Sequence, residues 1–191
     1  MDKKEIQERR KKGYFIDAAR KIISKKGVGK LTVKNIAERA GFAPGTMYNY
    51  FDDLNELLYF CAQDFWEECR VYVLNRMDNE KDFKEKVISF LKSYCQFFID
   101  EPNIFELIFL KDFDEFEEEL PESPQIAILF KKIIIEGGEE GFILEKDSNL
   151  VENILGSSVH GMLLFYIKKR SGKSKKELME FIEEEIEYVL D

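Results

Sequence analysis

A chain of 191 residues, 45% of them hydrophobic and 14% aromatic, is long enough to bury a sizeable core. Its formal net charge of −9 argues against a protein that wraps nucleic acid along its whole length. The charge is unevenly spread, because residues 1–50 hold 13 Lys and Arg against 5 Asp and Glu, whereas the remainder holds 16 against 33; this predicts that the N-terminal part meets a polyanion and that the rest has another task.

Apolar residues recur at helical spacing along the first fifty residues and predict three helices. The first helix follows a basic arm, residues 9–12, for which a solvated tail is an equal alternative, and it ends at Gly27. The second helix is capped by Thr32 and ends at Gly41. Pro44 suits the first position of a short third helix that reaches about Tyr50, because its fixed φ fits there and its missing N–H needs no partner in the first turn.

A capping arrangement, Asp53-x-x-Glu56, opens a fourth and longer helix that extends to about Arg76. Strand-like alternation and repeats of fixed period are absent from the sequence, so the predicted fold class is all-α. The further predicted helices are separated by short segments with Pro, Gly, Asn or Ser and lie at Lys81–Ile99, Asn103–Leu110, Gln125–Glu136, Leu150–Lys169 and Lys175–Leu190.

The cysteine and histidine pattern predicts neither a disulfide framework nor a metal site. Cys61, Cys69 and Cys95 form no C-x-x-C pair, and His160 is the one histidine, so the cysteines are interpreted as small buried hydrophobic residues. No cofactor is expected. The N-terminus is charged and no run approaches the roughly 18–20 apolar residues of a membrane span, which predicts a cytoplasmic protein without a membrane partner.

The second and third predicted helices, joined by a tight turn at Gly41, are typical of a helix-turn-helix, whose second helix enters the DNA major groove. Residues 43–46 are small and would let the helix backbone approach the bases. The O–H groups of Tyr48 and Tyr50 are placed to reach phosphates, which fixes register rather than sequence; the alternative for either ring is the core. Cations at Lys30, at Lys34 and in the arm would add phosphate contacts.

The stretch Thr32–Phe51, which reads TVKNIAERAGFAPGTMYNYF, and Leu57 after it resemble the DNA-binding module of the TetR family of bacterial transcriptional regulators. The resemblance covers about residues 9–70, and it implies that residues 71–191 form a helical domain that binds a small-molecule effector and makes a homodimer. It also implies that Thr32 and Lys34 face phosphate. The candidate DNA-binding residues are Lys30, Thr32, Lys34, Ala43, Pro44, Gly45, Thr46, Tyr48, Asn49 and Tyr50.

The sequence departs from the family pattern at two positions. The family usually has Ser or Thr as the cap before the third helix, where this chain has Ala43. It often has a Lys that grips phosphate at the start of the fourth helix, where this chain has Leu54. The first departure removes about 1 kcal/mol of helix capping. The second predicts that DNA affinity depends more on Lys30, Lys34 and the basic arm.

Most of the many aromatic residues after residue 60 are interpreted as core, but a helical bundle can still leave a cavity between its helices. The effector is predicted to be largely apolar and neutral or cationic, since a buried anion would need a paired cation, whereas a cation could use aromatic faces or Glu67 or Glu68. The acidic stretch 112–122 is either an exposed connection or a pocket mouth. The candidate pocket residues, with core packing as the alternative for each, are Trp66, Tyr94, Cys95, Phe98, Phe105, Phe109, His160 and Met162.

The last two predicted helices carry apolar stripes and are expected to pair with those of a second subunit, with an intrachain core as the alternative. The candidate interface residues are Ile154, Leu155, Val159, Leu163, Ile167, Phe181, Ile182 and Ile186.

Together these features predict a ligand-responsive repressor that covers a near-palindromic operator in double-stranded DNA. The first alternative is an activator, or a DNA-organising protein without a ligand. A helical enzyme is a remote alternative, because the sequence shows no spacing of nucleophile and base and offers a single histidine for acid–base work.

Overall fold

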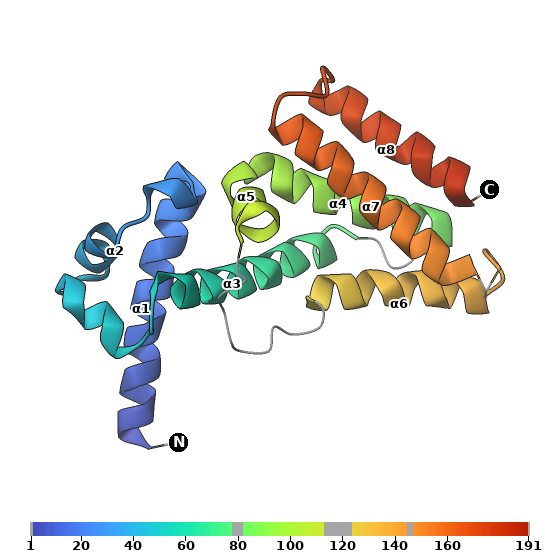
Figure 1. Ribbon diagram of the computed structural model, residues 1–191. Coiled ribbons are helices and arrows are strands. Elements are labelled where there is room, and N and C mark those ends of the chain that lie inside the picture. Colours follow the sequence, from blue (N-terminus) through green and yellow to red (C-terminus); the bar gives the residue numbers. More distant parts are fainter. Residues whose placement is uncertain (1, 78–81, 113–123, 145–146, 191) are drawn as a thin grey trace. The chain divides into compact units, whose positions relative to one another are not determined.

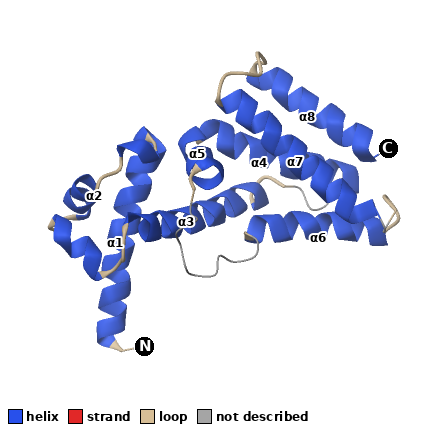
Figure 2. Cartoon of the chain, in the orientation of Figure 1, coloured by secondary structure: helices blue, strands red, loops and turns tan. Residues whose placement is uncertain are grey.

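The computed structural model of the chain describes residues 2–77, 82–112, 124–144 and 147–190. Every regular element in these ranges is helical (Figure 2), which confirms the all-α class. The chain forms two compact units. The first contains the residues up to Phe65 and the segment that begins at Glu101, and the second contains Trp66–Asp100 and the helices after residue 124. The functional division at residues 70 and 71 stays a prediction.

The first unit begins with α1, Lys3–Lys26, which starts earlier than the sequence pattern predicted. Asp2 caps it: the carboxylate of Asp2 accepts the backbone N–H of Glu5 at 2.9 Å, and the Glu5 carboxylate accepts the N–H of Asp2 at 2.7 Å. This reciprocal capping box stabilises a helix start that lies before residues 9–12. The expected basic arm is therefore wrong, because these residues form part of α1.

The other helices of the first unit are η1 (Val28–Lys30), α2 (Val33–Ala40), η2 (Pro44–Asn49), the start of α3 (Leu54–Leu74) and α5 (Pro102–Leu110). Phe15 of α1 lies at the centre of this unit and has no exposed surface. Its ring stacks on Phe42 at 5.1 Å between centroids and meets Phe51 edge-on at 6.3 Å. These rings connect α1 with the segments before and after η2 and fix where η2 sits.

Helix α5 packs on α1 although 75 or more residues separate them along the chain. Asn103 of α5 donates a hydrogen bond from its side-chain amide to the carbonyl of Ser24 at 2.9 Å, across 79 positions. Ser24 lies in the last turn of α1, where backbone carbonyls lack helical partners. Asn103 thus completes the C-terminal end of α1, a long-range contact that local sequence patterns do not reveal.

The second unit is a helical bundle in which α4 (Phe83–Asp100) packs against α6 (Gln125–Glu139), α7 (Ser148–Ile167) and α8 (Lys175–Leu190). Helices α7 and α8 run side by side in opposite directions (Figure 1). Phe90 of α4 stacks on Phe130 of α6 at 5.1 Å.

All three cysteines are buried and unpaired, as expected, and burial raises the pKa of each thiol far above its ordinary value.

No run was expected from the sequence to approach the length of a membrane span. That expectation needs correction for α7, whose 20 residues are long and apolar enough, by length and composition only, to cross a membrane. Within the chain only 22% of its apolar window is buried. Its buried residues include Val151, Leu155 and Leu163, which face the rest of the bundle. The helix is therefore a bundle helix with one face packed inside its own unit and an apolar remainder that this unit leaves uncovered.

We expect Gly137→Ala to destabilise the second unit, because a methyl group at Gly137 of α6 would overlap the ring of Phe83. That ring cannot easily move, since it is buried and stacks on Phe142 at 5.3 Å. Overpacking of this kind lowers the free energy of unfolding by about 1–3 kcal/mol. Chemical denaturation measures it, with Gly13→Ala as the control, because nothing lies within 4 Å of a methyl at Gly13. Equal stability of the two variants would contradict the overlap.

Candidate nucleic-acid interface

The N-terminal end of α2 is fixed by two side chains. Thr32 Oγ1 accepts the backbone N–H of Asn35 at 3.2 Å, and Asn35 Oδ1 accepts the N–H of Thr32 at 3.0 Å. The amide of Asn35 also donates to the carbonyl of Lys30 at 2.8 Å. The Thr32 cap was predicted from the sequence, whereas the return bond from Asn35 was missed because Asn replaces the usual Glu or Gln of a capping box.

The turn between the two helices depends on Gly41, which has φ 81° and ψ 29°. This left-handed conformation favours glycine, and it lets the N–H of Phe42 reach the carbonyl of Ala37 at 2.9 Å, so the end of α2 closes on itself. The chain then turns sharply into η2. The helix-turn-helix predicted from the sequence is thus present in the first unit.

The third helix is a 3₁₀ helix rather than an α-helix, although its range, Pro44–Asn49, matches the prediction. Ala43 precedes it in an extended conformation and provides no side-chain cap, whereas Pro44 occupies the first turn. Met47 is fully buried and anchors the helix to the core, a role that the sequence analysis did not single out. With one residue buried, the helix presents its remaining faces outward.

The candidate residues of this region, which lie in η1, α2, η2 and the segments beside them, are mostly exposed. Tyr48 is 57% exposed, so its phenol is free of the core. Tyr50 is half-buried, with its ring 5.9 Å from that of Phe15, so it combines the core and surface alternatives considered for it. Thr46 is half-buried, and the exposed members of the set are Lys30, Thr32, Lys34, Ala43, Pro44, Gly45 and Asn49.

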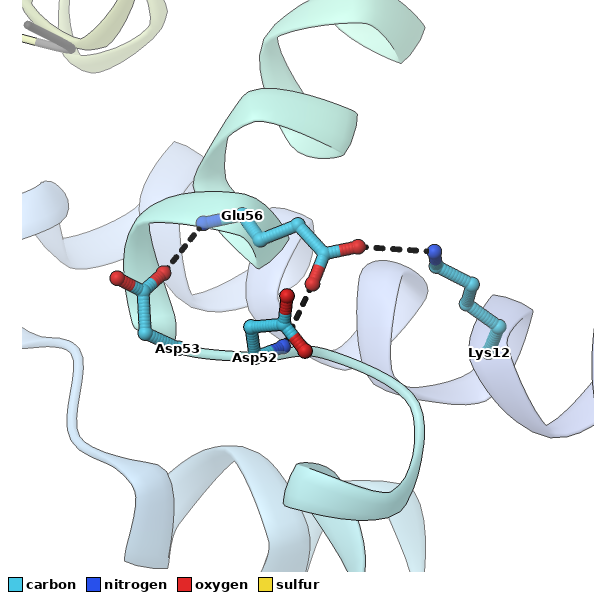
Figure 3. A network of polar contacts seen from close by, with 4 residues as sticks. All are labelled: Lys12, Asp52, Asp53 and Glu56. Atoms are coloured by element: carbon cyan, nitrogen blue, oxygen red, sulfur yellow. Dashed lines mark hydrogen bonds and ion pairs between the residues drawn. The ribbon is translucent and has the colours of Figure 1, made fainter. Parts of the chain in front are cut away.

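Lys12 differs from the other basic residues of the segment 9–12, because it is half-buried and forms an ion pair. Its ammonium pairs with a carboxylate oxygen of Glu56 in α3 at 3.1 Å (Figure 3). The other three basic residues of that segment, Arg9, Arg10 and Lys11, are exposed on α1. Lys34 is also exposed, and its contact with Glu38 at 4.0 Å is a surface pair that contributes little.

The candidate pocket residues divide between the two units. Phe105 and Phe109 belong to α5 of the first unit, where their rings lie 4.7 Å apart. The second unit holds an aromatic line in which Trp66 meets Phe98 at 6.1 Å and Phe98 meets Tyr94 at 5.0 Å. Cys95 is buried in this unit and Met162 is half-buried. Glu67 and Glu68 are exposed, and Glu67 pairs with Arg70 at 2.6 Å, so neither acid faces the interior.

His160 ends this aromatic line and is hydrogen-bonded through both ring nitrogens. Its Nδ1 lies 2.7 Å from the carbonyl of Gly156, and its Nε2 lies 2.7 Å from the hydroxyl of Tyr94. Because a carbonyl can only accept, Nδ1 carries the proton, and Nε2 of the neutral ring then accepts from Tyr94. Burial lowers the pKa of His160, which favours this neutral form. Among the described residues there is no group of three potential metal ligands.

The candidate interface residues also divide into two sets. Ile154 and Phe181 are exposed and Ile167 is half-buried, so they are available to a partner. The other five pack inside their own unit, and a residue with no exposed area has none left to bury against a second subunit. This buried set is Leu155, Val159, Leu163, Ile182 and Ile186.

Known proteins with similar sequences match the N-terminal unit. The sequence model of the family described as bacterial regulatory proteins, tetR family, matches residues 15–58. The uncharacterized HTH-type transcriptional regulator YvdT of Bacillus subtilis is 32% identical over 69 residues, or 36% of each chain. The HTH-type transcriptional regulator BetI of Escherichia coli is 38% identical over 63 residues, which cover 33% of this chain and 32% of that protein. The matched region spans about a third of the length of these relatives.

The fold is shared over almost the whole chain. The structure of RolR in complex with resorcinol has a TM-score of 0.72 and 15% identity, with 96% of this chain and 89% of that chain covered. The fold and the exposed helix-turn-helix define a protein of the helix-turn-helix class. More narrowly, the N-terminal unit carries the DNA-binding module of the TetR family of bacterial regulatory proteins, which the family model matches at residues 15–58.

Proposed function

We propose that the chain binds double-stranded DNA as a transcriptional repressor, with η2 as the recognition helix in the major groove. The observation that carries this proposal is the exposure of the outer faces of α2 and η2 while Met47 and Phe51 fix η2 to the core. A rigid, exposed helix with small residues at its leading end can enter a groove about 12 Å wide. The excess of Lys and Arg over Asp and Glu in residues 1–50 supports attraction to the phosphate backbone.

The test is selection of bound sequences from a random duplex library, followed by footprinting on the selected site. We expect a near-palindromic site with half-sites about one helical turn apart or somewhat more. Recovery of no enriched sequence would contradict sequence-specific binding. Reporter transcription with the site placed over a promoter then separates a repressor from an activator.

Two kinds of contact are expected to respond differently to substitution. Tyr48→Phe and Lys34→Ala should weaken binding to all duplexes alike, because phosphate contacts carry no sequence information. Thr46→Ala should relax the preference at particular base pairs by about 1–3 kcal/mol. Binding of each variant to a panel of single-base variants of the selected site measures both effects. A change of sequence preference in Tyr48→Phe with unchanged overall affinity would contradict these roles.

The proposal includes a homodimer, because one short helix reads too few bases. The exposed apolar remainder of α7, with Ile154 and Phe165, and Phe181 of α8 supply a surface that a second copy would cover. The five candidate residues buried within the chain would support that surface from behind. Ile154→Glu with Phe181→Glu should then yield monomers in sedimentation experiments and abolish binding to the palindromic site.

The proposed effector is a small, largely apolar molecule, neutral or cationic, that binds in the second unit and releases the operator in the cytoplasm. RolR, which shares the fold, was solved with the ligand resorcinol. Glu185 of α8 offers an acid that the sequence analysis did not single out, because its Oε2 atom is buried and accepts no hydrogen bond from the described residues. A hydrogen-bond donor or a cation on the ligand would satisfy this oxygen.

A screen of matched apolar anions, neutral compounds and cations tests this ligand class, with thermal shift and operator release as readouts. The ligand can act only through different affinities for the DNA-bound and free states. Operator release by carboxylates alone would contradict the class and leave the DNA-binding proposal intact.

A further inference from the structure

The carboxylate of Glu56 joins three parts of the first unit (Figure 3). One oxygen, Oε1, pairs with the ammonium of Lys12 on α1 at 3.1 Å. The other, Oε2, accepts the backbone N–H of Asp52 at 2.6 Å, in the segment that leads from η2 to α3. The backbone N–H of Glu56 itself donates to Asp53 at 2.8 Å, which caps α3. Glu56 therefore connects α1, the segment after η2 and the first turn of α3 to one another.

The ammonium of Lys12 is held by aromatic faces as well as by charge. It lies 3.9 Å from the ring centroid of Phe60 and 4.9 Å from that of Phe51. Phe51 is 1% exposed and follows η2 by two residues. The side chains of Lys12 and Glu56 retain 31% and 15% of their exposure, so the pair is shielded from water more than an ordinary surface pair.

The same corner is unfavourable for a phosphate. Asp52 and Asp53 are exposed beside Glu56, and the backbone N–H of Glu56 in the first turn of α3 donates to Asp53. The ammonium of Lys12 lies close to this corner, but it is paired with the carboxylate of Glu56. A DNA phosphate approaching this point would meet the negative charge of these carboxylates.

We propose that Lys12 and Glu56 are positioning residues that set the orientation of η2 without contacting DNA. The proposal rests on the DNA-binding function proposed above. It makes Lys12 different from its neighbours Arg9, Arg10 and Lys11, which have the same charge and remain exposed on α1.

The sign of one substitution separates positioning from simple electrostatics. Glu56→Gln removes a negative charge from a protein that binds a polyanion, so electrostatics alone predicts tighter binding. Positioning predicts weaker binding, by about tenfold for the selected operator, which corresponds to about 1.4 kcal/mol. Affinity for a duplex of scrambled sequence should change little, because phosphate contacts do not need the recognition helix in register.

Lys12→Met should have the same effect as Glu56→Gln, and the double variant should bind no more weakly than either single variant, because the two residues act as one unit. Lys12→Arg should restore operator affinity to within about threefold of the original, since an Arg can pair with the carboxylate and stack on the rings. The dependence of affinity on salt should keep its slope in Lys12→Met, whereas loss of a phosphate contact would reduce that slope by about 0.9.

A measurement without DNA completes the test. Amide resonances of Gly45, Thr46 and Tyr48 in the intact protein should shift in Lys12→Met and Glu56→Gln and stay in place in Lys11→Met. Equal or tighter operator binding by Glu56→Gln, or a reduced salt slope in Lys12→Met with unshifted η2 resonances, would overturn the proposal. If the original protein selected no DNA sequence, the proposed function would fail, and the resonances alone would still decide whether the pair positions η2.

Discussion

Gly45→Leu should abolish recognition of the selected operator without disturbing the fold. Gly45 is exposed in η2, and nothing lies within 4 Å of a Cβ atom placed there, so we expect the protein itself to accommodate an outward-pointing side chain. The larger side chain would instead project toward the bases and hold the helix backbone away from the groove floor. We expect operator affinity to fall by about 10³-fold, to the level of non-specific binding.

The measurement compares operator and scrambled duplexes at one salt concentration, with the melting temperature as the check on folding. Binding to the scrambled duplex serves as the internal control, since Lys30 and Lys34 are unchanged and should still bind phosphate. Gly45→Ala should show an intermediate loss. Full operator affinity in Gly45→Leu with an unaltered melting temperature would mean that this end of η2 does not approach the bases.

Phe15→Ala should unfold the first unit selectively. The ring of Phe15 has no exposed surface and contacts Phe42, Tyr50 and Phe51, which flank η2. Removing a buried phenyl ring costs about 3–5 kcal/mol, because burial is lost and a cavity remains. That is a large part of the roughly 5–15 kcal/mol that stabilises a typical domain.

Denaturant titration of the full chain, followed by far-UV circular dichroism, checks this prediction. We expect an earlier transition for the first unit and an unchanged one for the second, because Phe15 belongs to the first of the two compact units. Tyr14→Ala is the matched control: it removes an aromatic ring from the neighbouring position, but Tyr14 is 54% exposed. A similar loss of stability in both variants would show that Phe15 is not the centre of this core.

The range of η2 was predictable from local sequence, whereas its helix type was not. Gly41 marks the turn because its left-handed backbone conformation favours glycine, and Pro44 marks the helix start because its fixed φ and missing N–H suit the first turn. The 3₁₀ geometry was not predicted, since helix type depends on how Met47 and Tyr50 pack against the core and not on a local pattern.

The sequence by itself determined the all-α class, most helix limits, the helix-turn-helix and the candidate surface, because caps, turn residues and helical periodicity act over a few positions. Tertiary structure alone decided the partner of Lys12, which lies 44 positions away in Glu56, and the attachment of α5 to α1 through Asn103. It also decided which apolar residues of α7 and α8 face inward, since both faces of α7 are apolar and periodicity cannot rank them. Contacts between distant positions depend on how helices pack, and that information is not contained in any local pattern.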